Sequence, residues 1–99
     1  MKIVNESNFE SETKEGLVLV DFYADWCGPC RMLAPVLEQV TGVKIVKVNT
    51  DENPNLAAEY SISSIPRLLF MKDGKVVDQL AGLVRKQTIQ SKVDALKAQ

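Results

Sequence analysis

The chain has 99 residues, of which 45% are hydrophobic, and its 12 basic and 13 acidic side chains leave a net charge of −1. This length and composition predict a single folded domain, residues 1–99, and exclude a disordered chain. The balanced charge argues against a nucleic-acid partner, which needs clustered basic side chains. No apolar run approaches the roughly 20 residues that span a membrane. Residues 1–6 turn polar at once, unlike a secretory signal, so we expect a cytoplasmic location.

The first two predicted elements are a helix and a strand. Ser7 and Glu10 have the spacing of a capping box, which predicts a short helix over residues 8–14. Residues 17–23 form an almost continuous apolar run, interrupted by Asp21. Such a run is typical of a strand that is buried on both faces of a parallel or mixed sheet.

The remaining elements follow from periodicity and turn residues. Leu33, Val36, Leu37 and Val40 recur at helical spacing and predict a helix over residues 31–40. Strands alternating with helices indicate an α/β fold with a mixed sheet and helices on both faces. The other expected elements are a strand over 43–49, a short helix over 54–60 after an Asn-Pro cap, strands over 67–71 and 76–81 joined by an Asp-Gly turn, and an amphipathic helix over 87–98.

The only two cysteines, Cys27 and Cys30, lie in the sequence Trp-Cys-Gly-Pro-Cys between the strand over 17–23 and the helix over 31–40. A disulfide between them would close a very small loop and remove little chain entropy, so we interpret the pair as chemical. A zinc site needs about four ligands, and the chain has no further cysteine and no histidine. Two ordinary buried thiols and a metal site shared by two copies remain as alternatives.

The position of the two thiols predicts thiol–disulfide exchange. Cys27 immediately precedes a helix, where unpaired amides and the helix dipole favour a negatively charged thiolate. Gly28 permits a tight turn, and Pro29 presets the backbone for the first helical turn. We expect Cys27 to attack a substrate disulfide and Cys30, one turn later, to resolve the mixed disulfide.

Residues 20–35 resemble the thioredoxin family, and so do residues 49–54, 64–66, 70–74 and Gly82, in the same order. The resemblance covers nearly the whole chain. It implies the thioredoxin fold, with a central mixed sheet of four to five strands flanked by about four helices. It also implies a monomeric protein-disulfide reductase that binds no cofactor or metal. Its partners would be disulfide-containing client proteins and a thioredoxin reductase, which supplies NADPH and FAD chemistry.

Two charged residues gain roles from this resemblance. Burial of Asp21 within an apolar strand should raise the pKa of its carboxyl group. The resemblance implies that Asp21 accepts the proton of Cys30, directly or through water, and that Lys47 pairs with it. The alternatives are a carboxylate that reaches solvent at the strand end and an ordinary surface lysine.

The resemblance also implies a shallow surface that receives clients. Pro66 lacks an N–H group and cannot pair fully in a central strand. In the family the corresponding bond is cis and faces the cysteines, and the residue before it, here Ile65, offers its backbone to an extended peptide. A turn proline, and a Trp26 packed in the core, are the alternatives. The expected rim consists of Trp26, Gly28, Pro29, Ile65, Pro66 and Gly82.

The chain departs from the family pattern in three places. Arg67 stands where thioredoxins usually carry threonine; it could bias client choice, help to hold thiolate charge or point to solvent. The connection over residues 39–44 is short, so the preceding helix should end early. Residues 84–86 provide no good N-cap for the last helix.

Two other functions compete with the reductase. An oxidase or isomerase typically carries histidine between its cysteines, whereas this chain has Gly-Pro and no histidine. A non-redox binding subunit of a larger assembly would use the fold without the thiols. Substitution of Cys27 separates these functions, since only the binding subunit would keep working.

Overall fold

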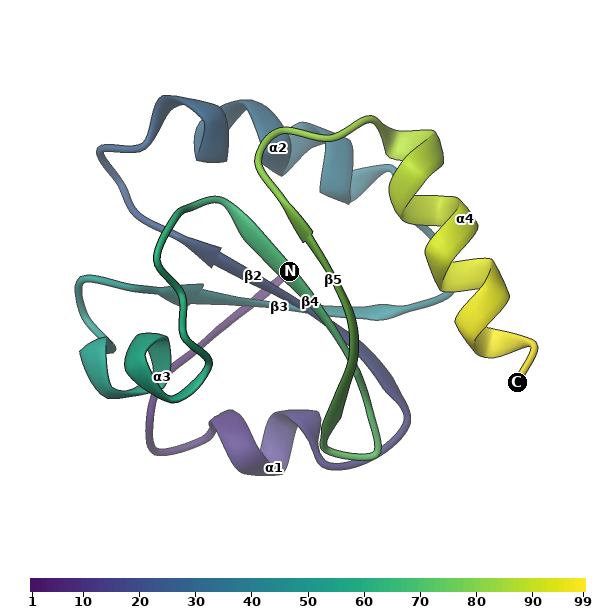
Figure 1. Cartoon of the computed structure of the whole chain (residues 1–99), viewed down its shortest axis with the longest axis horizontal. Coiled ribbons are helices and arrows are strands. Elements are labelled where there is room, and N and C mark those ends of the chain that lie inside the picture. Colours follow the sequence, from purple (N-terminus) through teal and green to yellow (C-terminus); the bar gives the residue numbers. More distant parts are fainter.

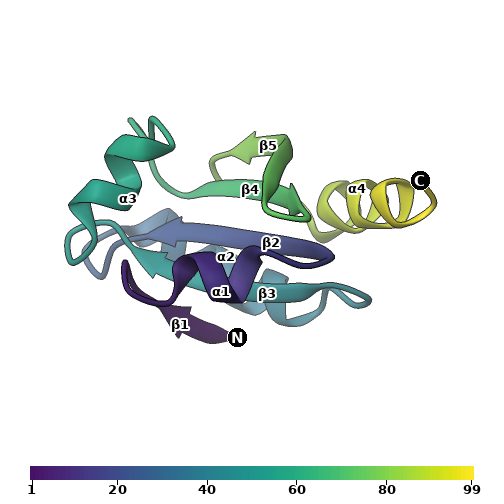
Figure 2. The same ribbon diagram turned by 90° about the horizontal axis from the view of Figure 1, so that it is seen from below.

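The computed structural model describes residues 1–99 and contains five strands and four helices. The strands form one sheet in the order β1-β3-β2-β4-β5, which Figure 2 shows edge by edge from β1 to β5. Strands β1 and β2 run parallel to β3, whereas β4 is antiparallel to both β2 and β5. The elements are β1 (Lys2–Val4), α1 (Phe9–Thr13), β2 (Leu17–Tyr23), α2 (Gly28–Glu38), β3 (Lys44–Asn49), α3 (Pro54–Glu59), β4 (Arg67–Lys72), β5 (Lys75–Ala81) and α4 (Lys86–Lys97).

Helices cover both faces of the sheet, as the sequence predicts (Figure 1). Helices α1 and α3 lie along one face, and α2 and α4 lie along the other. Each face carries its own apolar core, and β2 contributes to both because its residues alternate between them. Leu19, for example, packs toward α2 and α4, whereas Val20 packs toward α1 and α3.

Strand β2 is buried along most of its length, because it lies in the middle of the sheet between β3 and β4. Asp21 shares the face of Leu19, and the parallel register places it opposite Lys47 of β3. The sheet therefore carries one carboxyl group into its centre, on the side covered by α2.

The turn before α1 differs from the predicted capping box. Helix α1 has Asn8 at its N-cap, and the hydroxyl of Ser7 donates to Asn5 Oδ1 instead of accepting the amide of Glu10. Asn5 Oδ1 also accepts the amides of Ser7 and Asn8, at 2.9 and 3.2 Å. The capping-box prediction is wrong because Asn5 provides a competing acceptor within the same turn.

Other boundaries follow the predictions closely. Asp73 and Gly74 both have positive φ, 50° and 84°, and form the two-residue turn between β4 and β5. This conformation is the one that Asp-Gly favours in hairpins. Helix α2 ends at Glu38, two residues before the predicted end, and α4 begins after Arg85 without a side-chain cap.

Helix α3 has its N-cap at Asn53, as predicted, but the Asn53 side chain does not cap it. Asn53 Nδ2 instead donates to the carbonyl of Asn49, and Asn53 Oδ1 accepts the amide of Glu6. The Glu6 carboxylate accepts the amide of Asn55 at 2.9 Å and so provides an acceptor for an amide in the first turn of α3. None of the helices combines the length and the apolar character needed to cross a membrane.

Candidate active site

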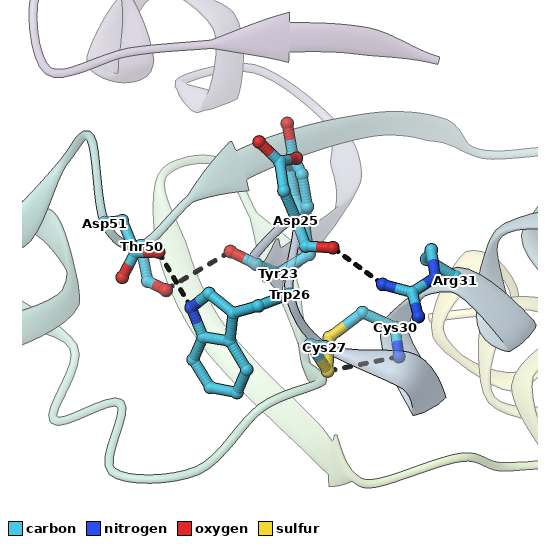
Figure 3. Close-up of a disulfide and its surroundings, with 8 residues drawn as sticks. All are labelled: Tyr23, Asp25, Trp26, Cys27, Cys30, Arg31, Thr50 and Asp51. Atoms are coloured by element: carbon cyan, nitrogen blue, oxygen red, sulfur yellow. Dashed lines mark hydrogen bonds between the residues drawn. A yellow bond between two sulfur atoms is a disulfide. The ribbon is translucent and has the colours of Figure 1, made fainter.

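The two cysteines lie where β2 has ended and α2 begins (Figure 3). Cys27 is the N-cap of α2, with extended backbone, and Pro29 lies in the first turn. Cys27 and Cys30 are joined by a disulfide, with their Cα atoms 5.2 Å apart. Both residues are almost fully buried, with 4% and 5% of their surface exposed.

The Cys27 sulfur occupies the place of a capping side chain. Its Sγ atom accepts the amide of Cys30 at 3.2 Å, as shown in Figure 3. An N-cap acceptor lies at the positive end of the helix dipole, next to amides that have no partner within the helix. After reduction, negative charge on this sulfur would be stabilised at this position.

Hydrogen bonds fix the turn that leads into α2. The Cys27 amide donates to the carbonyl of Ala24 at 3.2 Å. Arg31 Nη1 reaches back from the helix and donates to the carbonyl of Asp25 at 2.7 Å (Figure 3). The Thr50 amide donates to the carbonyl of Tyr23 at 2.8 Å. The turn is therefore tied both to α2 and to the segment after β3.

Trp26 lies outside the core, with 70% of its surface exposed, so the alternative of a core tryptophan is wrong. Its indole N–H donates to Asp51 Oδ2 at 2.9 Å, which holds the ring beside the disulfide (Figure 3). The ring borders a hollow of about 360 Å³ that runs toward the loop before β4. The hollow is lined by Trp26, Thr50, Ile62, Ser63, Ser64 and Ile65.

The loop before β4 completes the rim. The Ile65–Pro66 bond is cis, and Ile65 packs against Ala24 and the two cysteines. The Gly82 amide donates to the carbonyl of Pro66 at 2.9 Å, so the end of β5 lies beside this loop. Gly82 has a φ of 80°, and a Cβ added there would meet no atom within 4 Å. A side chain at this position would fit sterically, and it is the positive φ that favours glycine here.

Asp21 lies beneath α2 and is 1% exposed, so it does not reach solvent. One of its oxygens, Oδ1, has no hydrogen-bond partner. Burial raises the pKa of this carboxyl group from 3.8 to about 6, although the charge of Lys47 opposes the rise. The predicted rise of the Asp21 pKa is confirmed in direction and cause.

Lys47 does not form an ion pair with Asp21, although the two residues are opposite each other in the sheet. Its Nζ atom lies 4.3 Å from the centre of the Tyr23 ring, in a cation–π contact. Lys47 also borders a hollow of about 230 Å³ beside Cys30. The expected pairing with Asp21 is therefore replaced by a contact with Tyr23, two residues further along β2.

No group of three or more Cys, Asp or Glu side chains lies in an arrangement that could hold a metal ion, and the chain has no histidine. The cysteine pair itself is closed as a disulfide.

The model of the Thioredoxin family matches residues 1–95. The thioredoxin of Chlamydia caviae is 50% identical over 93 residues, which cover 90% of this chain and 91% of that protein. The chain belongs to the thioredoxin family. Thioredoxin 1 of Synechococcus elongatus is 49% identical over 98 residues, covering 92% of each chain.

A solved thioredoxin has the same fold. The structure of a single-residue mutant of thioredoxin from Halobacterium salinarum NRC-1 matches with a TM-score of 0.85 and 32% sequence identity. The match covers 95% of this chain and 89% of that chain. The predicted thioredoxin fold, with its mixed sheet and four helices, is confirmed.

Family membership and the redox-active cysteine pair make the chain a thiol–disulfide oxidoreductase, of the type that reduces protein disulfides. The predicted function is confirmed at this level. The alternative of a non-redox binding subunit finds no support among the relatives, which carry the name thioredoxin.

Arg67 begins β4 on the face of α1 and α3, opposite Phe22 in the register, whereas Asp21 lies on the other face. Its guanidinium donates to Gln79 Oε1 at 3.0 Å and to Ser64 Oγ at 3.1 Å, and its buried Nε has no partner. Arg67 therefore joins the rim loop to β5 through exposed hydrogen bonds.

Sequence reasoning missed Asp51 and Ser64. Asp51 lies in a segment that resembles thioredoxins, but its bond to the indole of Trp26 joins residues 25 positions apart. Ser64 borders the hollow beside Trp26 and accepts a hydrogen bond from Arg67. The polar Ser63-Ser64 pair before a proline was the available signal, because it indicates an exposed loop.

Proposed function

We propose that Cys27 is the attacking thiol and Cys30 the resolving thiol in the reduction of protein disulfides. The observation that carries this assignment is the position of Cys27 Sγ, which caps α2 and accepts the Cys30 amide at 3.2 Å. This site favours the thiolate, which is the nucleophile in disulfide exchange. Cys30 lies within the first helical turn, where its own sulfur lacks that cap.

The exchange occurs in two steps. The Cys27 thiolate attacks one sulfur of the client disulfide, a mixed disulfide forms, and the second client sulfur leaves as a thiolate that takes up a proton. Cys30 then loses its proton and attacks Cys27 Sγ. The remaining client sulfur leaves, and two electrons have passed from the dithiol to the client. The product is the Cys27–Cys30 disulfide, the state of the present structure.

Asp21 is proposed as the acceptor of the Cys30 proton. It is buried on the face covered by α2, and its Oδ1 has no hydrogen-bond partner, so this oxygen is free to accept a proton. Burial raises its pKa to about 6, close to the pH at which a general base is needed. Lys47 stands beside the hollow next to Cys30, where it can influence the charge of this pair.

Clients are proposed to dock on the rim around the disulfide. The hollow between Trp26 and Ile65 provides an apolar surface for a side chain near the client disulfide. The backbone before cis-Pro66 is proposed to pair with the client as an extended strand, which gives binding without a fixed sequence. Gly28, Pro29 and Gly82 contribute small residues, and Arg67 holds the rim loop through Ser64.

A thioredoxin reductase is proposed as the partner that restores the dithiol. FAD and NADPH act within that flavoprotein, and the chain itself binds neither. We further propose that residues 1–99 act as one domain, as a monomer in the cytoplasm, with no nucleic-acid or membrane partner.

An insulin reduction assay with a thioredoxin reductase and NADPH tests the proposal. The chain should support NADPH oxidation that depends on insulin, and Cys27→Ser should abolish it because no mixed disulfide can form. Cys30→Ser should retain the first step and accumulate the mixed disulfide, visible by mass spectrometry. Accumulation with Cys27→Ser instead would reverse the assignment of the two cysteines.

Alkylation of the reduced protein provides a second test of the assignment. Iodoacetamide should modify Cys27 faster than Cys30 near neutral pH, because only Cys27 caps the helix. Peptide mass spectrometry after short exposure reports the two rates. Equal rates would count against the assignment.

A further inference from the structure

The ammonium group of Lys47 has two possible neighbours and contacts only one of them. It lies 4.3 Å from the centre of the Tyr23 ring, whereas no ion pair to Asp21 is formed within 4 Å. Asp21 is opposite Lys47 in the register, and its Oδ1 lacks any hydrogen-bond partner. A buried carboxyl group with a free oxygen should attract a neighbouring cation strongly. The contact of Lys47 with the Tyr23 ring, in place of an ion pair with Asp21, therefore needs an explanation.

The sheet places all three side chains on one face. Asp21 and Tyr23 are two residues apart on β2, so their side chains point the same way, toward α2. Lys47 lies on the neighbouring strand β3, opposite Asp21. Adjacent strands lie roughly 4.8 Å apart, so the lysine stem is long enough to reach either partner. The Tyr23 ring stands at the end of β2, and the ammonium group of Lys47 lies over it.

The other charged groups around this site are few. Asp25 and Arg31 border the same hollow as Tyr23, Lys47 and Cys30. Arg31 is engaged with the carbonyl of Asp25 at 2.7 Å. The pKa of Tyr23 is raised, first by burial and then by Asp25, so the ring is neutral at physiological pH. A neutral phenol attracts a cation through the face of its ring.

We propose that Tyr23 is a positioning residue that holds the ammonium group of Lys47 over its ring and so keeps the Asp21 carboxyl group without an ionic partner. The inference rests on the proposed role of Asp21 as proton acceptor. A carboxylate paired with lysine is a weaker base, whereas an unpaired buried one holds a proton more readily. Tyr23 thus preserves the affinity of Asp21 for the proton that Cys30 must lose.

Four proteins form a double-mutant cycle that tests this inference: the wild type, Tyr23→Leu, Lys47→Met and the double variant. The readout is the pKa of Asp21 in the oxidised protein, from the pH dependence of its carboxyl ¹³C signal. Tyr23→Leu should lower this pKa by about one unit, because the freed ammonium group moves to Asp21. In the Lys47→Met background the same substitution should have no effect. Tyr23→Phe, which keeps the ring, should behave like the wild type.

Two results would overturn the inference. The pKa of Asp21 could stay unchanged in Tyr23→Leu, for instance because Lys47 moves to Asp25. Alternatively, the fall could persist in the double variant, which would assign it to water entering the space of the ring. The cycle reports the pKa of Asp21 in the folded protein, so neither result depends on enzyme activity.

The wild-type protein offers a test without any substitution, in case the leucine variant does not fold. The ε-methylene protons of Lys47 should be shifted upfield by the ring current of Tyr23, because Nζ lies over the ring. Unshifted protons would contradict the inference. The pH profile of mixed-disulfide resolution separates the inference from the proposed function. If the pKa of Asp21 falls in Tyr23→Leu but the pH profile does not move, Tyr23 positions Lys47 as inferred, and Asp21 is not the proton acceptor.

Discussion

Asp21 places an ionisable carboxyl group among buried apolar side chains. It occupies a strand whose other central residues are apolar, and burial disfavours its charged form. The folded protein therefore holds a proton on Asp21 at pH values where the unfolded chain has lost it. At the residue scale, the reactive state of the site is linked to the free energy of folding.

Asp21→Asn should remove this linkage in the oxidised protein. Because the pKa of Asp21 is raised from 3.8 to about 6, its contribution to stability is intact below pH 3.8 and is lost as the pH rises through 6. Each pKa unit corresponds to about 1.4 kcal/mol. The variant should therefore exceed the wild type in unfolding free energy by up to about 3 kcal/mol at pH 8 and by far less at pH 4.

Urea denaturation of both proteins at several pH values measures this difference. Other groups also titrate differently in the folded protein; the hydrogen bond with Lys2, for example, lowers the pKa of Glu12 to about 2. The difference between the two proteins removes the effect of these groups. A difference that is constant between pH 4 and pH 8 would show that Asp21 titrates normally.

At the scale of elements, the short helix α1 depends on the turn that precedes it. One side-chain oxygen of Asn5 accepts the Ser7 amide, the Ser7 hydroxyl and the Asn8 amide. Asn8 Oδ1 accepts the Asn5 amide in return, at 2.8 Å. A helix of five residues has little stability of its own, so this reciprocal pair and the buried Phe9 hold it in place.

Asn5→Ala should cost about 1 kcal/mol of unfolding free energy, because it leaves the amides of Ser7 and Asn8 without their side-chain acceptor. Ser7→Ala is the matched control and should cost less than about 0.5 kcal/mol, because Ser7 only donates to Asn5. Urea denaturation of the two variants provides the comparison. A larger loss for Ser7→Ala would restore the capping box that the sequence suggests.

For the whole molecule, the two apolar cores share β2, and this sharing should make unfolding cooperative. Ile89 of α4 is fully buried in the core covered by α2 and α4. Ile89→Val should cost about 1 kcal/mol. The unfolding midpoints followed by Trp26 fluorescence and by far-ultraviolet circular dichroism should shift together. Separate transitions would mean that the two layers unfold independently.

The sequence predicts the layered fold well because its signals are local. The apolar run over 17–23, the Asp-Gly turn and the proline after Asn53 each act through neighbouring residues. The position of the cysteines between a strand and a helix is read in the same way. Local signals therefore locate the site and its reactive atoms.

The sequence does not predict which of several possible partners a side chain contacts. Lys47 can reach Asp21 or Tyr23, and only the packing of the side chains decides between them. The Asn5 acceptor likewise displaces the predicted Ser7 cap. The bond of Trp26 to Asp51 joins distant segments that meet only in the folded sheet. Such contacts depend on tertiary structure, and spacing along the chain carries no information about them.

The disulfide joins two residues of a single helical turn, with Cα atoms 5.2 Å apart. Opening this small loop should leave the sheet and α2 in place, so the rim around Trp26 and Ile65 should keep its shape in both redox states. If the client and the reductase both dock on this rim, as proposed above, they compete for one place. A reduced client that is slow to leave should then delay the next cycle, so the proposal implies inhibition by product.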